Sequence, residues 1–242
     1  MGVIKSNRDY ATNIIYNAAV DEEKEWRKNG HIHDIAIVDQ LLGEVRELGY
    51  HYKYFVDITN RDNDENDLLQ LLLGYIGRFQ DDYYSAALVA VVGKKGNTSA
   101  TEIILKSYMG LSEESKRKHA GFYDNALNQI KDKQYVSSYM ELLKKPEDAI
   151  KLPLTMIMLA KWQLEDAKQY FLDYLNANIL YHNQTISDLV YISLEALSYY
   201  QDADGFILKA LEDKLNADDK DLLSATQKAI KRLKKRKIDK VS

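Results

Sequence analysis

Only two prolines, Pro146 and Pro153, occur in the 242 residues of this chain, and glycine occurs only 11 times. Proline removes a backbone donor and blocks the interior of a helix, and glycine is the other common breaker of regular structure. So few breakers over this length predict a chain that is helical throughout. Apolar residues make up 45% of the sequence, which is enough to build a hydrophobic core. We therefore expect an all-α fold.

The N-terminal part of the chain predicts helices without an obvious repeat. Apolar residues recur at helical intervals over residues 7–28, and a second helix begins near Asp34 and ends at Gly49. Residues 50–58 alternate like a strand, but a lone strand has no partner to pair with. A short helix is therefore favoured there over a strand, and both alternatives stay open. We expect residues 1–60 to form an irregular helical cap.

A helical pattern repeats in the remaining sequence. Residues 125–143 align with residues 157–175 at an offset of 32 without a gap, and a third copy begins 38 residues later. Apolar residues match at corresponding positions of the copies, among them Leu127, Leu159 and Leu197. Their spacing follows one face of a helix. The repeated unit is therefore a pair of helices joined by a short turn.

The copies resemble the helix pairs of HEAT-repeat proteins. Residues 159–175 and 195–211 each combine the end of one helix, a short turn containing aspartate, and a second helix with a ladder of leucines. Pro153 looks like the kinking proline of that family. The resemblance covers residues 68–237 and implies a right-handed α-α superhelix of stacked HEAT-like helix pairs. With the N-terminal cap it implies one α-solenoid domain over residues 1–242.

Charge is distributed unevenly along the chain. The formal net charge is −4, yet residues 228–240 contain eight basic residues and one acidic residue. The remainder carries 25 basic and 36 acidic residues, so the body of the protein is anionic. Such a body attracts cationic partners and repels phosphate backbones. We interpret the basic segment as a polar end of the array, with a nucleic-acid or anionic-lipid patch as the alternative.

No targeting segment or membrane span is predicted. The N-terminus lacks the apolar core of a signal peptide, and the longest apolar runs are far shorter than a bilayer crossing. A cytoplasmic protein without a membrane partner is therefore expected. Lysine outnumbers arginine 25 to 8, a bias typical of an AT-rich bacterial genome.

Residues that could carry catalysis are sparse. The chain has no cysteine, which excludes disulfides, thiolate nucleophiles and cysteine-ligated zinc. His31 and His33, with His51 nearby, form the one candidate metal cluster, but they lie beside Gly30 where a turn between helices is expected. No serine-nucleophile or metalloprotease motif occurs. We expect no enzyme activity, no cofactor and no metal site.

Tyrosine is abundant, with 18 residues. Most tyrosines in the repeats align with apolar residues, but Tyr123, Tyr170 and Tyr199 align with serine, threonine, lysine or glutamine in other copies. A position that accepts polar residues is expected to face solvent. Exposed tyrosine is common at protein-binding surfaces. These three residues are therefore the candidate binding residues.

Two functions follow from this reading. The first is a non-catalytic protein-protein interaction scaffold, in a narrower form an immunity or inhibitor protein that covers a basic partner. The second is a HEAT-like DNA-binding protein or DNA-repair glycosylase. That alternative needs a cationic groove, which the anionic body disfavours. We favour the scaffold, with a protein partner whose surface is basic.

Overall fold

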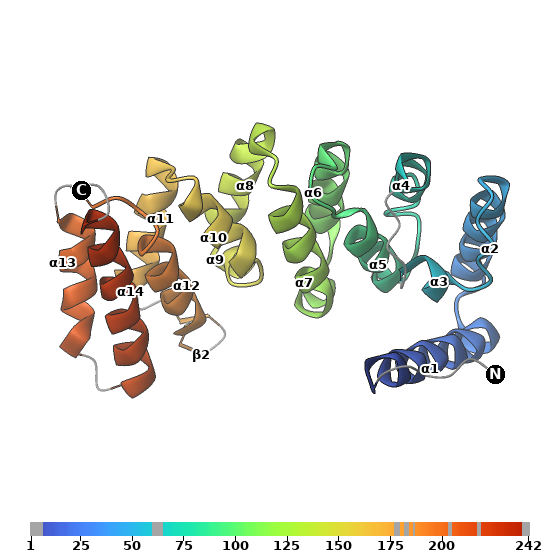
Figure 1. The fold of residues 1–242 in the computed structure, drawn as a ribbon, viewed down its shortest axis with the longest axis horizontal. Helices are drawn as coiled ribbons and strands as arrows, with labels where there is room; N and C mark the ends of the chain where they lie inside the picture. The colour runs from blue at the N-terminus through green and yellow to red at the C-terminus, as the bar shows by residue number, and fades with distance from the viewer. Residues whose placement is uncertain are drawn as a thin grey trace. The chain divides into compact units, whose positions relative to one another are not determined.

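The computed structural model describes residues 7–59, 65–176, 180–181, 184–185, 187–202, 205–216 and 219–238. The chain divides into two compact units, Met1–Ile130 and Lys131–Ser242. The first unit contains the expected N-terminal cap together with the helices that follow it (Figure 1). The predictions of an α-solenoid and of a single domain concern how these parts are arranged together, and they stay predictions.

The described chain is helical apart from one short strand pair, which confirms the all-α prediction. The first unit contains α1 (Asn7–Asn29), α2 (Ile32–Glu47), α3 (Phe55–Thr59), α4 (Asn66–Leu73), α5 (Asp82–Val92), η1 (Thr98–Ala100), α6 (Thr101–Gly110) and α7 (Glu113–Ile130). The second contains η2 (Lys133–Tyr135), α8 (Val136–Leu143), α9 (Pro146–Ala149), α10 (Pro153–Lys161), α11 (Glu165–Asn176), α12 (Ser187–Leu197), α13 (Phe206–Glu212), η3 (Asp213–Asn216) and α14 (Lys220–Ile238). Two-residue strands β1 (Leu180–Tyr181) and β2 (Gln184–Thr185) pair antiparallel. Within the described ranges, no helix is long and apolar enough to cross a membrane.

The segment 50–58 ends in a short helix, α3, rather than forming a strand. Asp57 explains why so short a helix is stable. Its Oδ2 accepts hydrogen bonds from the backbone amides of Lys53 and Tyr54 at 2.8 and 3.0 Å, and so satisfies donors that a helix start leaves open. Its Oδ1 accepts a 2.6 Å hydrogen bond from the Tyr16 hydroxyl on α1. The carboxylate therefore joins α3 to α1.

The sequence places the start of the second helix near Asp34, where this residue could cap it, but Asp34 does not cap α2. The helix begins at Ile32, and the Asp34 side chain is fully buried. Its two oxygens accept hydrogen bonds from the backbone amides of Gln80 and Asp81, at 2.7 and 3.0 Å. A buried carboxylate needs such partners because it has lost its water. Asp34 therefore fastens α2 to the turn that precedes α5.

Helix α5 packs against α4 on one side and α7 on another, within the first unit. Leu68 and Leu72 of α4 and Leu88 of α5 are fully buried. Gly93, at the C-cap of α5, lies against Ala126 of α7 so closely that a Cβ at position 93 would collide with it. Glycine is required there because two helix backbones meet.

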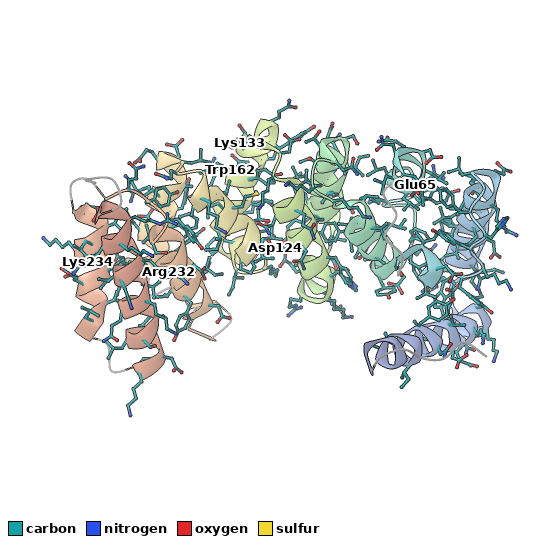
Figure 2. All side chains as sticks on the ribbon, in the orientation of Figure 1. Glu65, Asp124, Lys133, Trp162, Arg232 and Lys234 are labelled. Atoms are coloured by element: carbon teal, nitrogen blue, oxygen red, sulfur yellow. The ribbon has the colours of Figure 1, made fainter. Side chains whose placement is uncertain are left out.

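Most of the aligned apolar positions of the sequence repeat are buried, but Leu154 is 40% exposed and Trp162 is only half-buried. Leu127, Leu159 and Leu197 are each 0% exposed. Tyr139 and Phe171, which also match at the offset of 32, are each 0% exposed as well. In the second unit, Trp162 at the end of α10 packs on Tyr139 with ring centroids 6.0 Å apart, and the Lys133 ammonium lies 5.6 Å from the Trp162 centroid (Figure 2).

Helix α14 packs against α12 and α13 at the end of the second unit (Figure 1). Ala229, Ile230 and Leu233 are buried on its inner face. Part of its basic charge is paired, since Arg232 lies 3.4 Å from Glu195 and Lys234 lies 3.5 Å from Glu212.

Candidate functional site: an aromatic pocket with an acidic rim

Tyr123 is not a surface residue, and this part of the sequence-based prediction is wrong. It is 0% exposed, its ring lies 5.6 Å from that of Tyr108, and its hydroxyl is 2.9 Å from Ser107 Oγ. The residues aligned with it, Thr155 and Ser193, are also 0% exposed. Small hydroxyl residues fit at this buried position, so polar residues in the alignment column did not indicate exposure.

Tyr199 and Tyr170 are half-buried residues of the second unit. The ring of Tyr199, in the turn after α12, has Lys161 Nζ 5.0 Å and Arg236 Cζ 4.7 Å from its centroid. Its backbone carbonyl accepts a 2.5 Å hydrogen bond from Arg236. Tyr199 therefore already holds cations of this chain, while Tyr170 lies on α11. Among the described residues, no ring contact joins the two.

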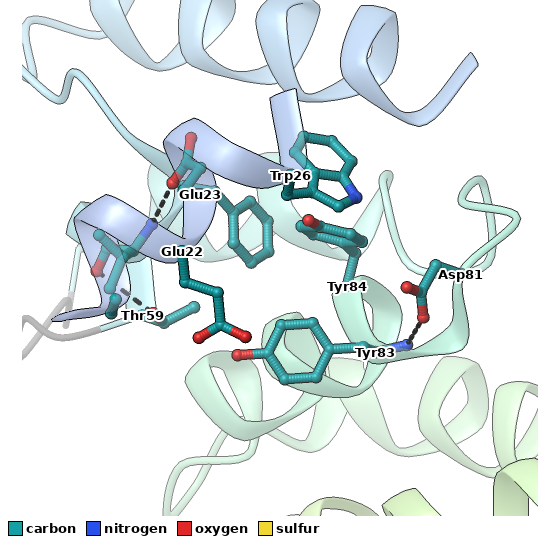
Figure 3. A pocket seen from close by; sticks show the side chains of 10 residues that line it. Glu22, Glu23, Trp26, Thr59, Asp81, Tyr83 and Tyr84 are labelled. Atoms are coloured by element: carbon teal, nitrogen blue, oxygen red, sulfur yellow. Dashed lines mark hydrogen bonds between the residues drawn. The ribbon is translucent and has the colours of Figure 1, made fainter. Parts of the chain in front are cut away.

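A pocket in the first unit provides more concentrated recognition chemistry. It has a volume of about 240 Å³ and lies between α1, α3 and the start of α5 (Figure 3). Aromatic side chains form much of its lining, and carboxylates stand beside them: Trp26, Phe55, Tyr83 and Tyr84, with Glu22, Glu23 and Asp81. These residues are far apart in the sequence, and the packing of the three helices brings them together.

The aromatic wall is a packed cluster centred on Tyr84. Its ring centroid lies 4.7 Å from that of Trp26, 5.0 Å from that of Phe55 and 5.6 Å from that of Tyr83. Tyr84 and Phe55 are buried, whereas Tyr83 is 47% exposed. The wall is therefore buried at its base and accessible at its mouth.

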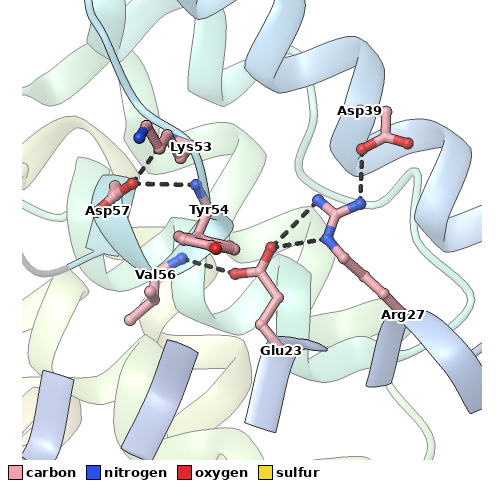
Figure 4. A network of polar contacts seen from close by, with 7 residues as sticks. All are labelled: Glu23, Arg27, Asp39, Lys53, Tyr54, Val56 and Asp57. Atoms are coloured by element: carbon pink, nitrogen blue, oxygen red, sulfur yellow. Dashed lines mark hydrogen bonds and ion pairs between the residues drawn. The ribbon is translucent and has the colours of Figure 1, made fainter. Parts of the chain in front are cut away.

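The three carboxylates differ in exposure and in how many hydrogen bonds they already make within the protein. Glu23 is buried; its Oε2 accepts a 3.3 Å hydrogen bond from the Val56 amide and its Oε1 lies 3.2 Å from Arg27 (Figure 4). Asp81 caps α5 by accepting a 2.9 Å hydrogen bond from the Tyr83 amide. Glu22 is exposed, and its carboxylate points toward the Tyr83 side chain (Figure 3). Glu22 is therefore the carboxylate best placed for a ligand.

The pocket is electrostatically negative. Burial raises the pKa of Tyr83, and the nearby Glu22 and Asp81 carboxylates raise it further. Burial also raises the pKa of Tyr84, with added contributions from Asp81 and Glu23. In both cases burial and the nearby carboxylates disfavour the negative charge of an ionised tyrosine. The same field favours a positive charge placed between the rings and Glu22.

The arrangement suits a cation bound by aromatic faces and a carboxylate. A cation within about 6 Å of an aromatic ring is attracted by the negative face of that ring. The described residues contain no group of three or more side chains placed to hold a metal ion. His31 and His33 flank the start of α2, where His33 Nδ1 lies 3.6 Å from Asp34 Oδ1. The aromatic faces and the Glu22 carboxylate therefore have chemistry suited to an organic cation.

The sequence signal for this pocket was weak. Tyr83 follows Asp81 and Asp82 closely, and Trp26 follows Glu22, Glu23 and Glu25. Aromatic residues beside acids on two predicted helices could have suggested a cation site. Nothing in the spacing showed that the two helices meet.

No family model, curated protein or solved structure matches this chain.

Proposed function

We propose that this chain is a non-catalytic protein-interaction scaffold of HEAT-like helix pairs, and that its aromatic pocket receives a cationic side chain of a basic protein partner. The proposal rests mainly on the position of Glu22 beside a wall of four aromatic residues. Cation and ring faces attract one another, and a carboxylate adds a charge-assisted hydrogen bond.

The size of the pocket supports a side chain as its occupant. Its volume of about 240 Å³ is below the range of roughly 300–1,000 Å³ typical of sites for drug-sized ligands. A single arginine or lysine side chain needs less room than a substrate. The anionic body of the chain would further attract a basic partner from a distance.

Arginine is the better fit of the two. Its planar guanidinium can stack on a tyrosine face while two of its N–H groups reach one carboxylate. The ammonium of lysine is a compact, strongly hydrated point charge that cannot do both. We therefore expect arginine to bind more tightly than lysine.

Trp26 provides a direct test, since the chain has only one other tryptophan, Trp162. In a Trp162→Phe background, titration with N-acetyl-arginine amide should change Trp26 fluorescence in a saturable way. Replacing Glu22 by Gln should weaken this binding about tenfold, because one charge-assisted hydrogen bond is lost.

Glu25→Gln is the matched control. Glu25 is exposed on the same helix, pairs with Lys28 at 2.5 Å and does not line the pocket. It removes the same charge and should leave the affinity for arginine unchanged. A titration without saturation, or equal effects of Glu22→Gln and Glu25→Gln, would refute the pocket as a cation site.

The DNA-binding or glycosylase alternative rests on α14. Lys231, Lys234 and Lys235 surround a hollow floored by Leu215 and Ile230. Against it, Lys234 is already paired with Glu212. Binding of duplex DNA at near-physiological salt, lost on removal of residues 235–242, would favour this alternative over the scaffold.

A further inference from the structure

A second pocket of the first unit has the opposite charge. It has a volume of about 440 Å³ and lies where α2 meets α1 and the segment before α3. Its basic residues come from all three elements: Arg27 from α1, Arg46 from α2, and His51 and Lys53 from the segment before α3. Asp39 is the acidic residue that lines it.

The one acidic group of this pocket is already engaged. Arg27 Nη1 donates a 2.7 Å hydrogen bond to Asp39, and its Nη2 lies 3.2 Å from the buried Glu23 (Figure 4). Two carboxylates therefore hold the Arg27 guanidinium in place. Asp39 is left with little capacity to neutralise the other cations of the pocket.

Arg46 and Lys53 have donors to spare. Arg46 donates from Nε to the Leu42 carbonyl at 2.9 Å, which uses one of the five N–H donors of its guanidinium and leaves the four on its terminal nitrogens for a ligand. Both residues are exposed. Bringing like charges together raises the free energy of the folded chain unless an anion lies between them.

The floor of the pocket is apolar and aromatic. Leu42 is 4% exposed and Tyr52 is 6% exposed, and both line the cavity. A bare inorganic anion would fill only part of a cavity of about 440 Å³ and would not use this floor. An anion that carries a small organic group would contact both the basic side chains and the apolar floor.

We propose that this pocket binds a small phosphate monoester, with the phosphate held by Arg46 and Lys53 and the organic group against Tyr52 and Leu42. Arginine recognises phosphate through two parallel N–H donors, and lysine adds a point charge. The two pockets have no lining residue in common, and Glu23 of the cation pocket is ion-paired with Arg27 of this pocket.

Isothermal titration calorimetry of the full chain at constant ionic strength tests this. Glycerol 3-phosphate is the probe, and glycerol and inorganic phosphate are the reference ligands. We expect saturable binding of glycerol 3-phosphate, about tenfold tighter than that of inorganic phosphate, and no binding of glycerol. Absence of saturation, or equal affinity for inorganic phosphate, would overturn the assignment.

Three charge-removing variants locate the site. Arg46→Gln and Lys53→Gln should each weaken binding about tenfold. Lys95→Gln removes the same charge from an exposed residue of the same unit outside the pocket, and should leave binding unchanged. Equal weakening by Lys95→Gln would show general electrostatic attraction and refute the site.

Two further results keep the test decisive. Circular dichroism would show whether Arg46→Gln folds. If it does not, Lys53→Gln still tests whether this pocket binds the phosphate. A phosphorylated peptide that binds more than about tenfold tighter than glycerol 3-phosphate would mean a protein ligand and would overturn the small-molecule assignment. Glu22→Gln should leave phosphate binding intact, so failure of the cation pocket would not affect this result.

Discussion

Lys131 and Gln163 are 32 residues apart and both adopt a left-handed backbone conformation, with φ of 56° and 57°. Among the described non-glycine residues, these two alone have positive φ. Their separation equals the offset at which the sequence aligns with itself. Lys131 directly follows α7, and Gln163 directly follows Trp162, the C-cap of α10. Each ends a helix with a conformation for which glycine is usually chosen.

Glycine at either of these positions should stabilise the protein. A left-handed conformation costs a non-glycine residue about 1–2 kcal/mol, partly offset by the greater unfolded-state entropy of glycine. We expect Lys131→Gly and Gln163→Gly to raise the free energy of unfolding by about 0.5–1 kcal/mol each. Urea denaturation followed by circular dichroism would measure it.

Gln169→Gly is the control for these variants. Gln169 is exposed within α11, so glycine should cost about 1 kcal/mol there. Destabilisation by all three substitutions would contradict the role of the two left-handed turns.

Removal of the Asp34 carboxylate should destabilise the first unit. Asp34→Ala leaves the amides of Gln80 and Asp81 without their acceptor, at a cost of about 2–4 kcal/mol. Asp21→Ala, at an exposed residue paired with Lys24, should change stability by less than about 0.5 kcal/mol. Thermal unfolding compares the two variants. Equal melting temperatures of Asp34→Ala and Asp21→Ala would contradict a stabilising role of Asp34 between α2 and the turn before α5.

Alkaline pH should unfold the chain as buried tyrosines ionise. Burial is the main cause that raises the pKa of Tyr84, Tyr139, Tyr174 and Tyr200. Because the folded-state pKa lies above the unfolded value of about 10, stability is fully present below that pH and decreases as the pH rises above it.

Absorbance at 295 nm and circular dichroism should therefore change together above about pH 10. Complete ionisation of all tyrosines with the helical signal intact would contradict the burial of these four side chains.

Arg236 should hold the end of α14 on the turn after α12. Its guanidinium lies over the Tyr199 ring and donates to the Tyr199 carbonyl. Arg236→Gln should lower the free energy of unfolding by about 0.5–1 kcal/mol. Lys228→Gln removes a charge from an exposed position of the same helix and should have no effect beyond about 0.3 kcal/mol. Chemical denaturation measures the free energy of unfolding of both variants. Equal losses in Arg236→Gln and Lys228→Gln would contradict a specific role of Arg236.

The sequence by itself determined that the chain is helical and that the repeated leucines face inward. Few helix breakers and the recurring apolar spacing predicted α1, α7, α10 and α11, and Leu127, Leu159 and Leu197 are buried as expected. These features depend on neighbours within about one or two helical turns, which periodicity reports directly.

Only the tertiary structure decided where functional groups meet. Tyr123 is buried although its aligned positions hold polar residues, and Asp34 serves a turn 46 residues away instead of its own helix. Glu22 and Tyr83 share a pocket because α1 and α5 both pack on α3. Such contacts depend on how helices pack in space, and the hydrophobic period of a single helix carries no information about which other helix it will meet.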